Sequence, residues 1–243
     1  MDQTTNFNTQ PIGPIKPKRR WYRRWWGIVL ILFLIYFLAM TAVLLLSPGE
    51  TSDLNVSSGN GFTGQNQVKE EELYLHSEND PVFGNPGAKV KIVEFGDFQC
   101  PYCRQSFPIV REMLERYGNK IYFIYRDFPV SDVHDDAQKA AEAGQCANLQ
   151  GKFWPFHDKV FINQENIAVL DLKRYALELG IERKAFDDCL DSGRFAEEVS
   201  EDYLDGINLG VVGTPTFFIN GYRISGSIPE EIFIQLIEAA LRE

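Results

Sequence analysis

The chain has 243 residues, 44% of them hydrophobic, which is enough for a buried core in one domain or two small ones. Its formal net charge is −10 at pH 7, although the first 46 residues hold six basic side chains against the single acidic residue Asp2. An acidic main body does not attract a phosphate backbone, so we expect no nucleic-acid partner and interpret the basic N-terminus as a topology signal.

Residues 27–46 form an apolar run of 20 residues without a charge. A helix of this length, at about 1.5 Å per residue, crosses a hydrocarbon core of roughly 30 Å. The run is preceded by basic residues and by an aromatic cluster typical of a membrane interface: Trp21, Tyr22, Trp25 and Trp26. We therefore predict one transmembrane helix, a signal anchor in the cell membrane, with residues 1–26 in the cytoplasm and the remainder extracytoplasmic. A cleaved signal peptide is the alternative, although its apolar region is usually about 7 to 15 residues long.

Residues 47–70 are rich in Gly, Ser, Asn and Thr and nearly lack large apolar side chains. This composition predicts a flexible linker. From residue 71 onward the pattern changes to periodic apolar segments, which predicts one folded domain over residues 71–243.

The first half of this domain predicts a strand, a helix and a second strand. Residues 89–95 alternate and then run apolar, as in a buried strand, and residues 120–125 form a similar run. Residues 101–117 between them have helical spacing, with Pro108 expected to kink the helix. This order favours a right-handed crossover that joins two parallel strands.

The second half begins with helical patterns over about residues 133–209, which predict four or five short helices. Residues 216–219 and 222–225 flank an Asn-Gly pair that suits the type I′ turn of a hairpin. Residues 229–241 close the chain as an amphipathic helix. The expected architecture is α/β, a mixed sheet with helices on both faces and an all-helical insertion between its two halves.

The chain has four cysteines, two of which, Cys100 and Cys103, stand in the sequence CPYC directly after the first strand. A zinc site of the usual kind would need a second closely spaced pair, so we expect no metal. A purely structural bridge between Cys100 and Cys103 would close too small a loop to remove much unfolded-state entropy. We therefore interpret them as a redox-active disulfide that needs no cofactor.

The position of the pair predicts separate roles for the two sulfurs. Cys100 stands where the helix begins, so unsatisfied N–H groups and the positive end of the helix dipole stabilise its thiolate. Pro101 occupies the first helical turn without wasting a hydrogen-bond donor. Cys103 lies about one turn inside the helix. We expect Cys100 to attack and Cys103 to resolve.

The other two cysteines, Cys146 and Cys189, fall in separate predicted helices of the insertion. They are interpreted either as buried free thiols or, because the count is even in an exported domain, as a structural disulfide. His134 and His157 are expected to have no catalytic role, and the aromatic residues of segment 150–161 are expected to be core. The acidic run at residues 197–205 is interpreted as a solvated helix face.

Three features together resemble the DsbA-like branch of the thioredoxin superfamily, in particular its membrane-anchored, BdbD-like members. They are the strand followed by CPYC and a helix, the helical insertion, and the later sequence GVVGTPTFFINGYRISG at residues 210–226. The resemblance covers about residues 75–241 and implies a thioredoxin-like fold and protein thiol-disulfide oxidoreductase activity. It also implies that the Thr214-Pro215 bond is cis and lies against the active-site disulfide.

The same resemblance places Glu94 at the family's buried acidic position beneath the disulfide. A carboxyl group there, with its pKa raised by burial, would relay a proton from Cys103. The strand pattern leaves an exposed strand glutamate as the alternative. Tyr102 departs from the histidine of the DsbA motif CPHC and adds no positive charge to the thiolate, so the direction of electron flow stays open.

We predict a membrane-tethered dithiol oxidase that introduces disulfides into exported proteins. The resemblance implies reduced exported proteins as substrates and a DsbB-like or VKOR-like membrane oxidase as redox partner. One alternative is a disulfide reductase or isomerase of the same fold, which Tyr102 favours. The other is a non-enzymatic, tethered peptide-binding or chaperone module that uses the groove beside Thr214-Pro215.

Overall fold

The computed structural model describes residues 32–34, 36 and 80–242. The chain divides into two compact units, Met1–Asn60 and Gly61–Glu243, and the second contains every described residue from 80 onward. No helix in this described part is long and apolar enough to span a bilayer. The predicted cytoplasmic segment 1–26, the linker 47–70 and all but four residues of the predicted span 27–46 lie outside the described residues, so these assignments remain predictions.

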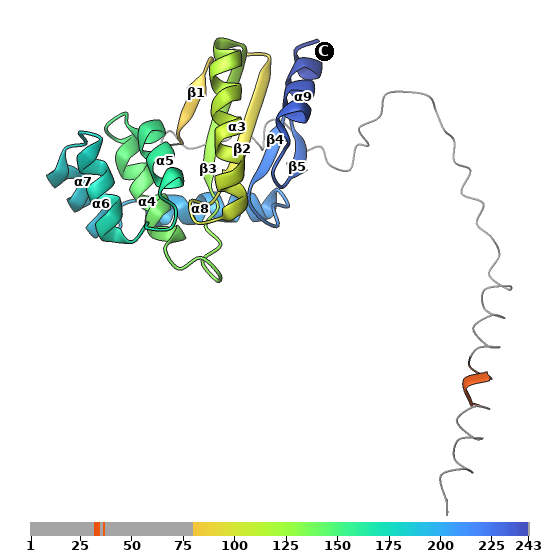
Figure 1. Ribbon diagram of the computed structural model, residues 1–243, viewed down its shortest axis with the longest axis horizontal. Helices are drawn as coiled ribbons and strands as arrows, with labels where there is room; N and C mark the ends of the chain where they lie inside the picture. Colours follow the sequence, from red (N-terminus) through yellow and green to blue (C-terminus); the bar gives the residue numbers. More distant parts are fainter. Residues whose placement is uncertain (1–31, 35, 37–79, 243) are drawn as a thin grey trace, which may run out of the picture. The chain divides into compact units, whose positions relative to one another are not determined.

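A mixed five-stranded sheet forms the centre of the second unit, with strand order β1-β3-β2-β4-β5 (Figure 1). The strands are β1 (Val82–Gly84), β2 (Val90–Gly96), β3 (Ile121–Asp127), β4 (Thr216–Ile219) and β5 (Tyr222–Ser225). Strands β2 and β3 run parallel, whereas the β1–β3, β2–β4 and β4–β5 pairs are antiparallel. The predicted parallel pair and the predicted hairpin are confirmed. The short edge strand β1 was not predicted.

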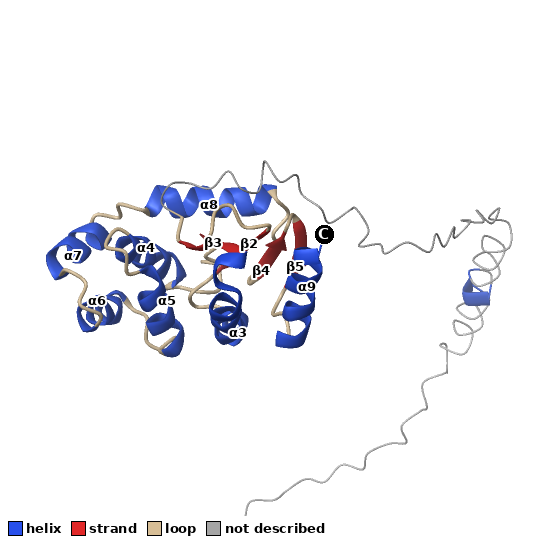
Figure 2. Cartoon of the chain, turned by 90° about the horizontal axis from the view of Figure 1, so that it is seen from above, coloured by secondary structure: helices blue, strands red, loops and turns tan. Residues whose placement is uncertain are grey.

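Helices cover both faces of this sheet (Figure 2). Helices α3 (Pro101–Tyr117) and α9 (Glu230–Arg242) lie on one face, and α8 (Ala196–Asn208) lies across the other. The remaining helices of the insertion lie together beyond the β1 and β3 side of the sheet in both views; they are α4 (Ala137–Asn148), α5 (Phe153–Ile162), α6 (Val169–Glu178) and α7 (Arg183–Asp191). The thioredoxin-like α/β fold with an all-helical insertion of five helices is therefore confirmed. Helix α3 continues through Pro108 as one element.

The alternation of side chains along β2 decides which residues lie beneath α3. Val93 and Phe95 pack in the smaller core cluster with Phe218, whereas Ile92 packs in the main cluster with residues of α3 and α9. Since side chains two apart in a strand share a face, Glu94 lies on the same face as Ile92. The sequence of β2 therefore brings a carboxyl group under the helix that carries CPYC.

The type I′ turn of the β4–β5 hairpin forms as predicted. Asn220 and Gly221 have φ values of 45° and 83°, the positive values that this turn requires at both central positions. The Asn220 side chain also accepts a hydrogen bond from the Lys91 N–H at 2.8 Å, which ties the turn to β2. The hairpin is thereby fixed in register beside the active-site strand.

The acidic run at residues 197–205 is not entirely a solvated face, so that interpretation is wrong for part of α8. Asp202 is 1% exposed and its Oδ1 accepts from the Nε of Arg126 at 2.7 Å. Its Oδ2 accepts the Asp127 N–H at 2.9 Å. A buried guanidinium at the end of β3 requires carboxylate partners, and α8 supplies Asp202 and Asp205. These pairs fasten α8 to the sheet.

Candidate active site

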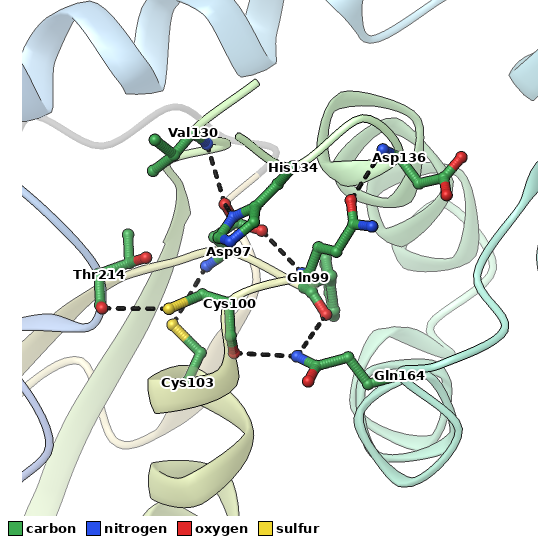
Figure 3. A network of polar contacts seen from close by, with 10 residues as sticks. Asp97, Gln99, Cys100, Cys103, Val130, His134, Asp136, Gln164 and Thr214 are labelled. Atoms are coloured by element: carbon green, nitrogen blue, oxygen red, sulfur yellow. Dashed lines mark hydrogen bonds and ion pairs between the residues drawn. The ribbon is translucent and has the colours of Figure 1, made fainter. Parts of the chain in front are cut away.

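The CPYC motif forms the first turn of α3, directly after β2 (Figure 3). Cys100 is the N-terminal cap of the helix and Pro101 its first residue, while Cys103 lies one turn inside. Both cysteines carry free thiols, with 4% and 1% of the residue exposed for Cys100 and Cys103. The structure thus brings the two sulfurs together at a helix N-terminus, the environment that stabilises a thiolate.

The environment of Cys100 favours its ionised form. A hydrogen bond from the Cys103 thiol is the largest cause, and the backbone N–H groups of Cys103 and Tyr102 add to it. Together they lower the pKa of Cys100 to about 6, although partial burial acts in the opposite direction. At pH 7 Cys100 is therefore mostly thiolate, both a good nucleophile and a good leaving group.

The environment of Cys103 has the opposite effect. Burial raises the pKa of this thiol well above its ordinary value, and the nearby charges of Cys100 and Glu94 raise it further. The backbone N–H of Asp97 donates to the Cys103 sulfur at 3.4 Å, which offsets part of that increase. The pair is therefore strongly asymmetric, with the charge on Cys100 and the proton on Cys103.

The loop that precedes β4 lies against Cys100. The Thr214-Pro215 bond is cis, as the resemblance implies, and the Cys100 sulfur lies 3.2 Å from the Thr214 carbonyl oxygen, to which it donates when it is protonated. The Thr216 hydroxyl donates to the Gly213 carbonyl at 2.7 Å across this turn. Arg223 of β5 donates to the carbonyls of the α8 C-terminus, which fixes the start of the loop.

Glu94 is buried beneath the cysteine pair, so the structure excludes the exposed alternative. The residue is 3% exposed and pairs in register with Tyr125 on β3 and Phe217 on β4. Burial raises the pKa of Glu94 to about 8, and its charge is one of the causes that raise the pKa of Cys103. At neutral pH Glu94 therefore holds a proton next to the less exposed sulfur.

Replacing Glu94 with glutamine tests this burial through stability. The folded-state pKa of about 8 lies above the ordinary value of 4.5, so the wild type loses stability as pH rises between these values. Between pH 5 and pH 8, we expect the free energy of unfolding of the wild type to fall relative to that of Glu94→Gln by on the order of 3 kcal/mol. Urea titrations at both pH values measure this difference. Parallel pH dependences of the two proteins would contradict it.

Tyr102 lies at the surface beside Cys100, with 62% of its area exposed. A groove of about 500 Å³ extends from it, lined by residues of α3 and of the segments around the hairpin: Tyr102, Gln105, Ile109, Thr214, Gly226, Ser227 and Pro229. Since the groove reaches Thr214, an extended peptide lying in it would place a thiol near Cys100. Tyr102 is thus placed to contact substrate, without adding charge to the thiolate.

Asp97 connects the cysteine pair to the loop after β3 (Figure 3). Its Oδ2 accepts from the Val130 N–H at 2.9 Å and lies 2.7 Å from the Nδ1 of His134. Its Oδ1 accepts the Gln99 N–H at 2.7 Å in an Asx turn. Asp97 and His134 therefore hold the active-site turn in position, although neither residue was predicted to have a role there.

The insertion holds the active-site turn from two further points. The Gln99 side chain accepts the N–H of Asp136, the residue that precedes α4. From the segment between α5 and α6, the buried Nε2 of Gln164 donates to the carbonyls of Phe98 and Cys100, each at 2.9 Å. The turn that carries Cys100 is thus fixed by side-chain hydrogen bonds on both sides. The position of Asp97, just before the CPYC motif, could have indicated a role in the site. Nothing in the sequence around Gln164 gives such an indication.

Three other residues considered in the sequence, Cys146, Cys189 and His157, lie in helices of the insertion. A disulfide joins Cys146 of α4 to Cys189 of α7 across 43 residues of sequence. His157 is buried among aromatic rings of α5 and the active-site turn, and its Nδ1 lies 3.0 Å from the Oδ1 of Asp158. In the described part of the chain, no group of three or more His, Cys, Asp or Glu side chains is arranged to hold a metal ion.

Comparison with known proteins gives the class of protein that this fold and site define. The thioredoxin family model matches residues 76–239. The structure of oxidised BdbD from Bacillus subtilis superposes with a TM-score of 0.62 and 24% identity over 68% of this chain and 94% of that chain. The α-DsbA1 structure from Wolbachia pipientis gives a TM-score of 0.60 and 25% identity over 70% and 95% of the two chains. The chain belongs to the thioredoxin family, and its fold is similar to that of these DsbA-like proteins.

A second comparison matches the chain to a part of longer proteins. The Na(+)/H(+) antiporter NhaA 1 of Salinispora arenicola is 42% identical over 164 residues, which are 67% of this chain and 25% of the antiporter. The chain spans about a quarter of the length of this curated relative. The similarity therefore concerns one segment of the antiporter.

Proposed function

We propose that this protein is a membrane-tethered dithiol oxidase that introduces disulfides into exported proteins through Cys100 and Cys103. The observation that carries the proposal is the asymmetry of the pair. The pKa of Cys100 is lowered to about 6, whereas that of Cys103 is raised well above its ordinary value. A stabilised Cys100 thiolate favours the reduced form over the disulfide, and this makes the oxidised pair a strong acceptor of electrons.

The proposed reaction begins with the Cys100–Cys103 disulfide. A substrate thiolate attacks the Cys100 sulfur, the bond between the two enzyme sulfurs breaks, and Cys103 leaves. Because its buried site disfavours a thiolate, the Cys103 sulfur takes the proton of Glu94, whose pKa of about 8 keeps it protonated at pH 7. A second substrate thiolate then attacks the substrate sulfur of the mixed disulfide, and Cys100 leaves as a thiolate. The substrate loses two electrons and the enzyme gains them.

Location and partners follow from the same proposal. A helix at residues 27–46 would anchor the protein in the cell membrane, and the linker 47–70 would carry the domain on the extracytoplasmic side. Reduced exported proteins would be the substrates. Reoxidation would require a membrane oxidase of the DsbB-like or VKOR-like kind. The thioredoxin fold and the likeness to BdbD support these assignments.

The second candidate is a reductase or isomerase of the same fold, and Tyr102 is the feature that favours it. Tyrosine leaves the motif without the cationic partner that a histidine would offer the Cys100 thiolate. The redox state of the pair in its own membrane separates the two candidates. Thiol trapping of intact cells would find Cys100 and Cys103 oxidised at steady state for an oxidase and reduced for a reductase.

Replacing Tyr102 with histidine measures how much this position contributes. We expect Tyr102→His to lower the pKa of Cys100 by roughly one unit and to raise the reduction potential by about 30 mV at pH 6, where the imidazole is charged. Thiolate absorbance at 240 nm and equilibration with glutathione measure the two quantities. Tyr102→Phe is the control and should leave both near the wild-type values. Identical results for the histidine and phenylalanine variants would contradict the prediction.

A further inference from the structure

Tyr125 carries a buried hydroxyl group beside the cysteine pair. The residue lies in β3 and is 0% exposed, and its hydroxyl has no hydrogen-bond partner among the described residues. A buried donor without a partner destabilises the fold, so its presence in a native structure needs an explanation.

Tyr125 adjoins both groups that exchange a proton in the proposed reaction. It is the register partner of Glu94 on the neighbouring parallel strand. Tyr125 packs in the main core cluster with Cys103, on the face of the sheet that α3 covers. Burial raises the pKa of the Tyr125 phenol well above its ordinary value, and the charges of Cys103 and Glu94 are among the further causes. The hydroxyl is therefore a neutral donor placed among groups that become anionic.

The backbone makes room for this hydroxyl at Gly96. A Cβ atom at residue 96 would lie 2.5 Å from the Tyr125 oxygen and 2.6 Å from its ring, closer than atoms can approach. Gly96 ends β2, between Glu94 and the turn that carries Cys100. The phenol thus reaches from its own strand past Glu94 toward the active-site turn, which a larger residue at position 96 would prevent.

Three other ionisable groups surround the phenol. Asp97 and Asp127 lie near enough for their charges to raise the pKa of Tyr125, and the His157 ring packs edge-on with its centroid 5.4 Å away. The described residues show no hydrogen bond between any of these three groups and the Tyr125 hydroxyl. Asp97 is engaged by Val130, Gln99 and His134, and the Oδ2 of Asp127 by Gln145, whereas the Oδ1 of Asp127 has no hydrogen-bond partner among the described residues. Among the groups whose charges act on the Tyr125 phenol, Glu94 and Cys103 are the two that exchange a proton in the proposed reaction.

We propose that Tyr125 is a positioning residue for the proton transfer, because its hydroxyl donates to the Glu94 carboxylate that forms as the disulfide opens. In this step the incoming thiolate bonds to the Cys100 sulfur and the Cys100–Cys103 bond breaks. The proton of Glu94 passes to the Cys103 sulfur, and the negative charge moves to the carboxylate. The hydroxyl without a partner in the dithiol form acquires one when that charge appears. This inference rests on the proposed role of Glu94.

Tyr125→Phe in the full-length chain removes the oxygen atom and nothing else. We expect reduced glutathione to open the Cys100–Cys103 disulfide of this variant about tenfold more slowly than in the wild type at pH 7. The rate constant per glutathione thiolate should fall with rising pH, because Glu94 loses its proton. This fall should occur near pH 8 in the wild type and at a higher pH in the variant. The direction of the shift follows because a carboxylate without its donor is harder to form. Stopped-flow mixing with thiol trapping measures both.

Tyr122→Phe is the matched control, because Tyr122 lies on the same strand but packs in the cluster on the opposite face. Its rate and pH profile should equal those of the wild type. The free energy of unfolding of Tyr125→Phe should equal or exceed the wild-type value, since no hydrogen bond is lost. A wild-type rate and profile for Tyr125→Phe, or a loss of stability that accompanies the slower rate, would overturn the inference.

The glutathione reaction also separates this inference from the proposed function. It opens the disulfide whichever way electrons flow in the cell. A slow Tyr125→Phe variant of a wild type that fails to oxidise reduced proteins would therefore support the role of Tyr125 and refute the oxidase.

Discussion

The Cys100→Ser variant is expected to lose thiol-disulfide exchange down to background, a loss on the order of 10³-fold or more. Cys100 is the more exposed sulfur and the one with the lowered pKa, so no other group in the described site can replace it as nucleophile. Oxidation of a reduced peptide, followed by thiol trapping, measures the loss. The unfolding midpoint should stay near that of the wild type, because a hydroxyl replaces a thiol of similar size.

The matched variant Cys103→Ser separates attack from resolution. It keeps the Cys100 thiolate but cannot displace a bound partner, so a mixed disulfide with glutathione should accumulate and be visible by mass spectrometry. Substantial exchange by Cys100→Ser would contradict the assignment. The chaperone alternative makes a different prediction, since peptide binding in the groove beside Thr214-Pro215 would survive in Cys100→Ser.

Removal of the disulfide between α4 and α7 should have the largest effect on stability. It closes a loop of 43 residues, and the chain-entropy relation gives about 4 kcal/mol for a loop of this length. The double variant Cys146→Ala, Cys189→Ala should lose a comparable free energy of unfolding in guanidinium chloride. Cys100→Ser is the control that removes a thiol and keeps the bridge. A loss below about 1 kcal/mol would show that the helices of the insertion hold together without the bridge.

The local pattern of the sequence was sufficient for most elements of the fold. The helix over Pro101–Tyr117 and the hairpin strands Thr216–Ile219 and Tyr222–Ser225 were predicted with the boundaries that the structure has. Each has a strong local cause: a helical apolar stripe that starts at a proline, and an Asn-Gly turn between apolar runs. Strand β1 lacks such a cause, because it has three residues, ends in glycine and lies at the sheet edge.

The buried polar residues could not be derived from local pattern, because their burial depends on partners distant in sequence. Asp202 looks like one member of an acidic face, and its burial follows from Arg126 on another element. Gln164 bonds the active-site turn from 64 residues away. Tyr125 resembles any aromatic residue in a strand until its partnership with Glu94 and Gly96 is visible. The alternation in the strand before CPYC did not decide whether the Glu94 side chain is buried or exposed. The resemblance to a known family predicted the buried position.

The equilibrium reduction potential of the Cys100–Cys103 pair against glutathione tests the central claim most directly. The lowered pKa of Cys100 predicts a stabilised reduced form, and therefore a potential near or above about −150 mV, in the range of a thiol oxidant. The potential is measured on the full-length chain by thiol trapping across a series of glutathione ratios. A value near about −250 mV or lower would contradict the account and point to a reductase.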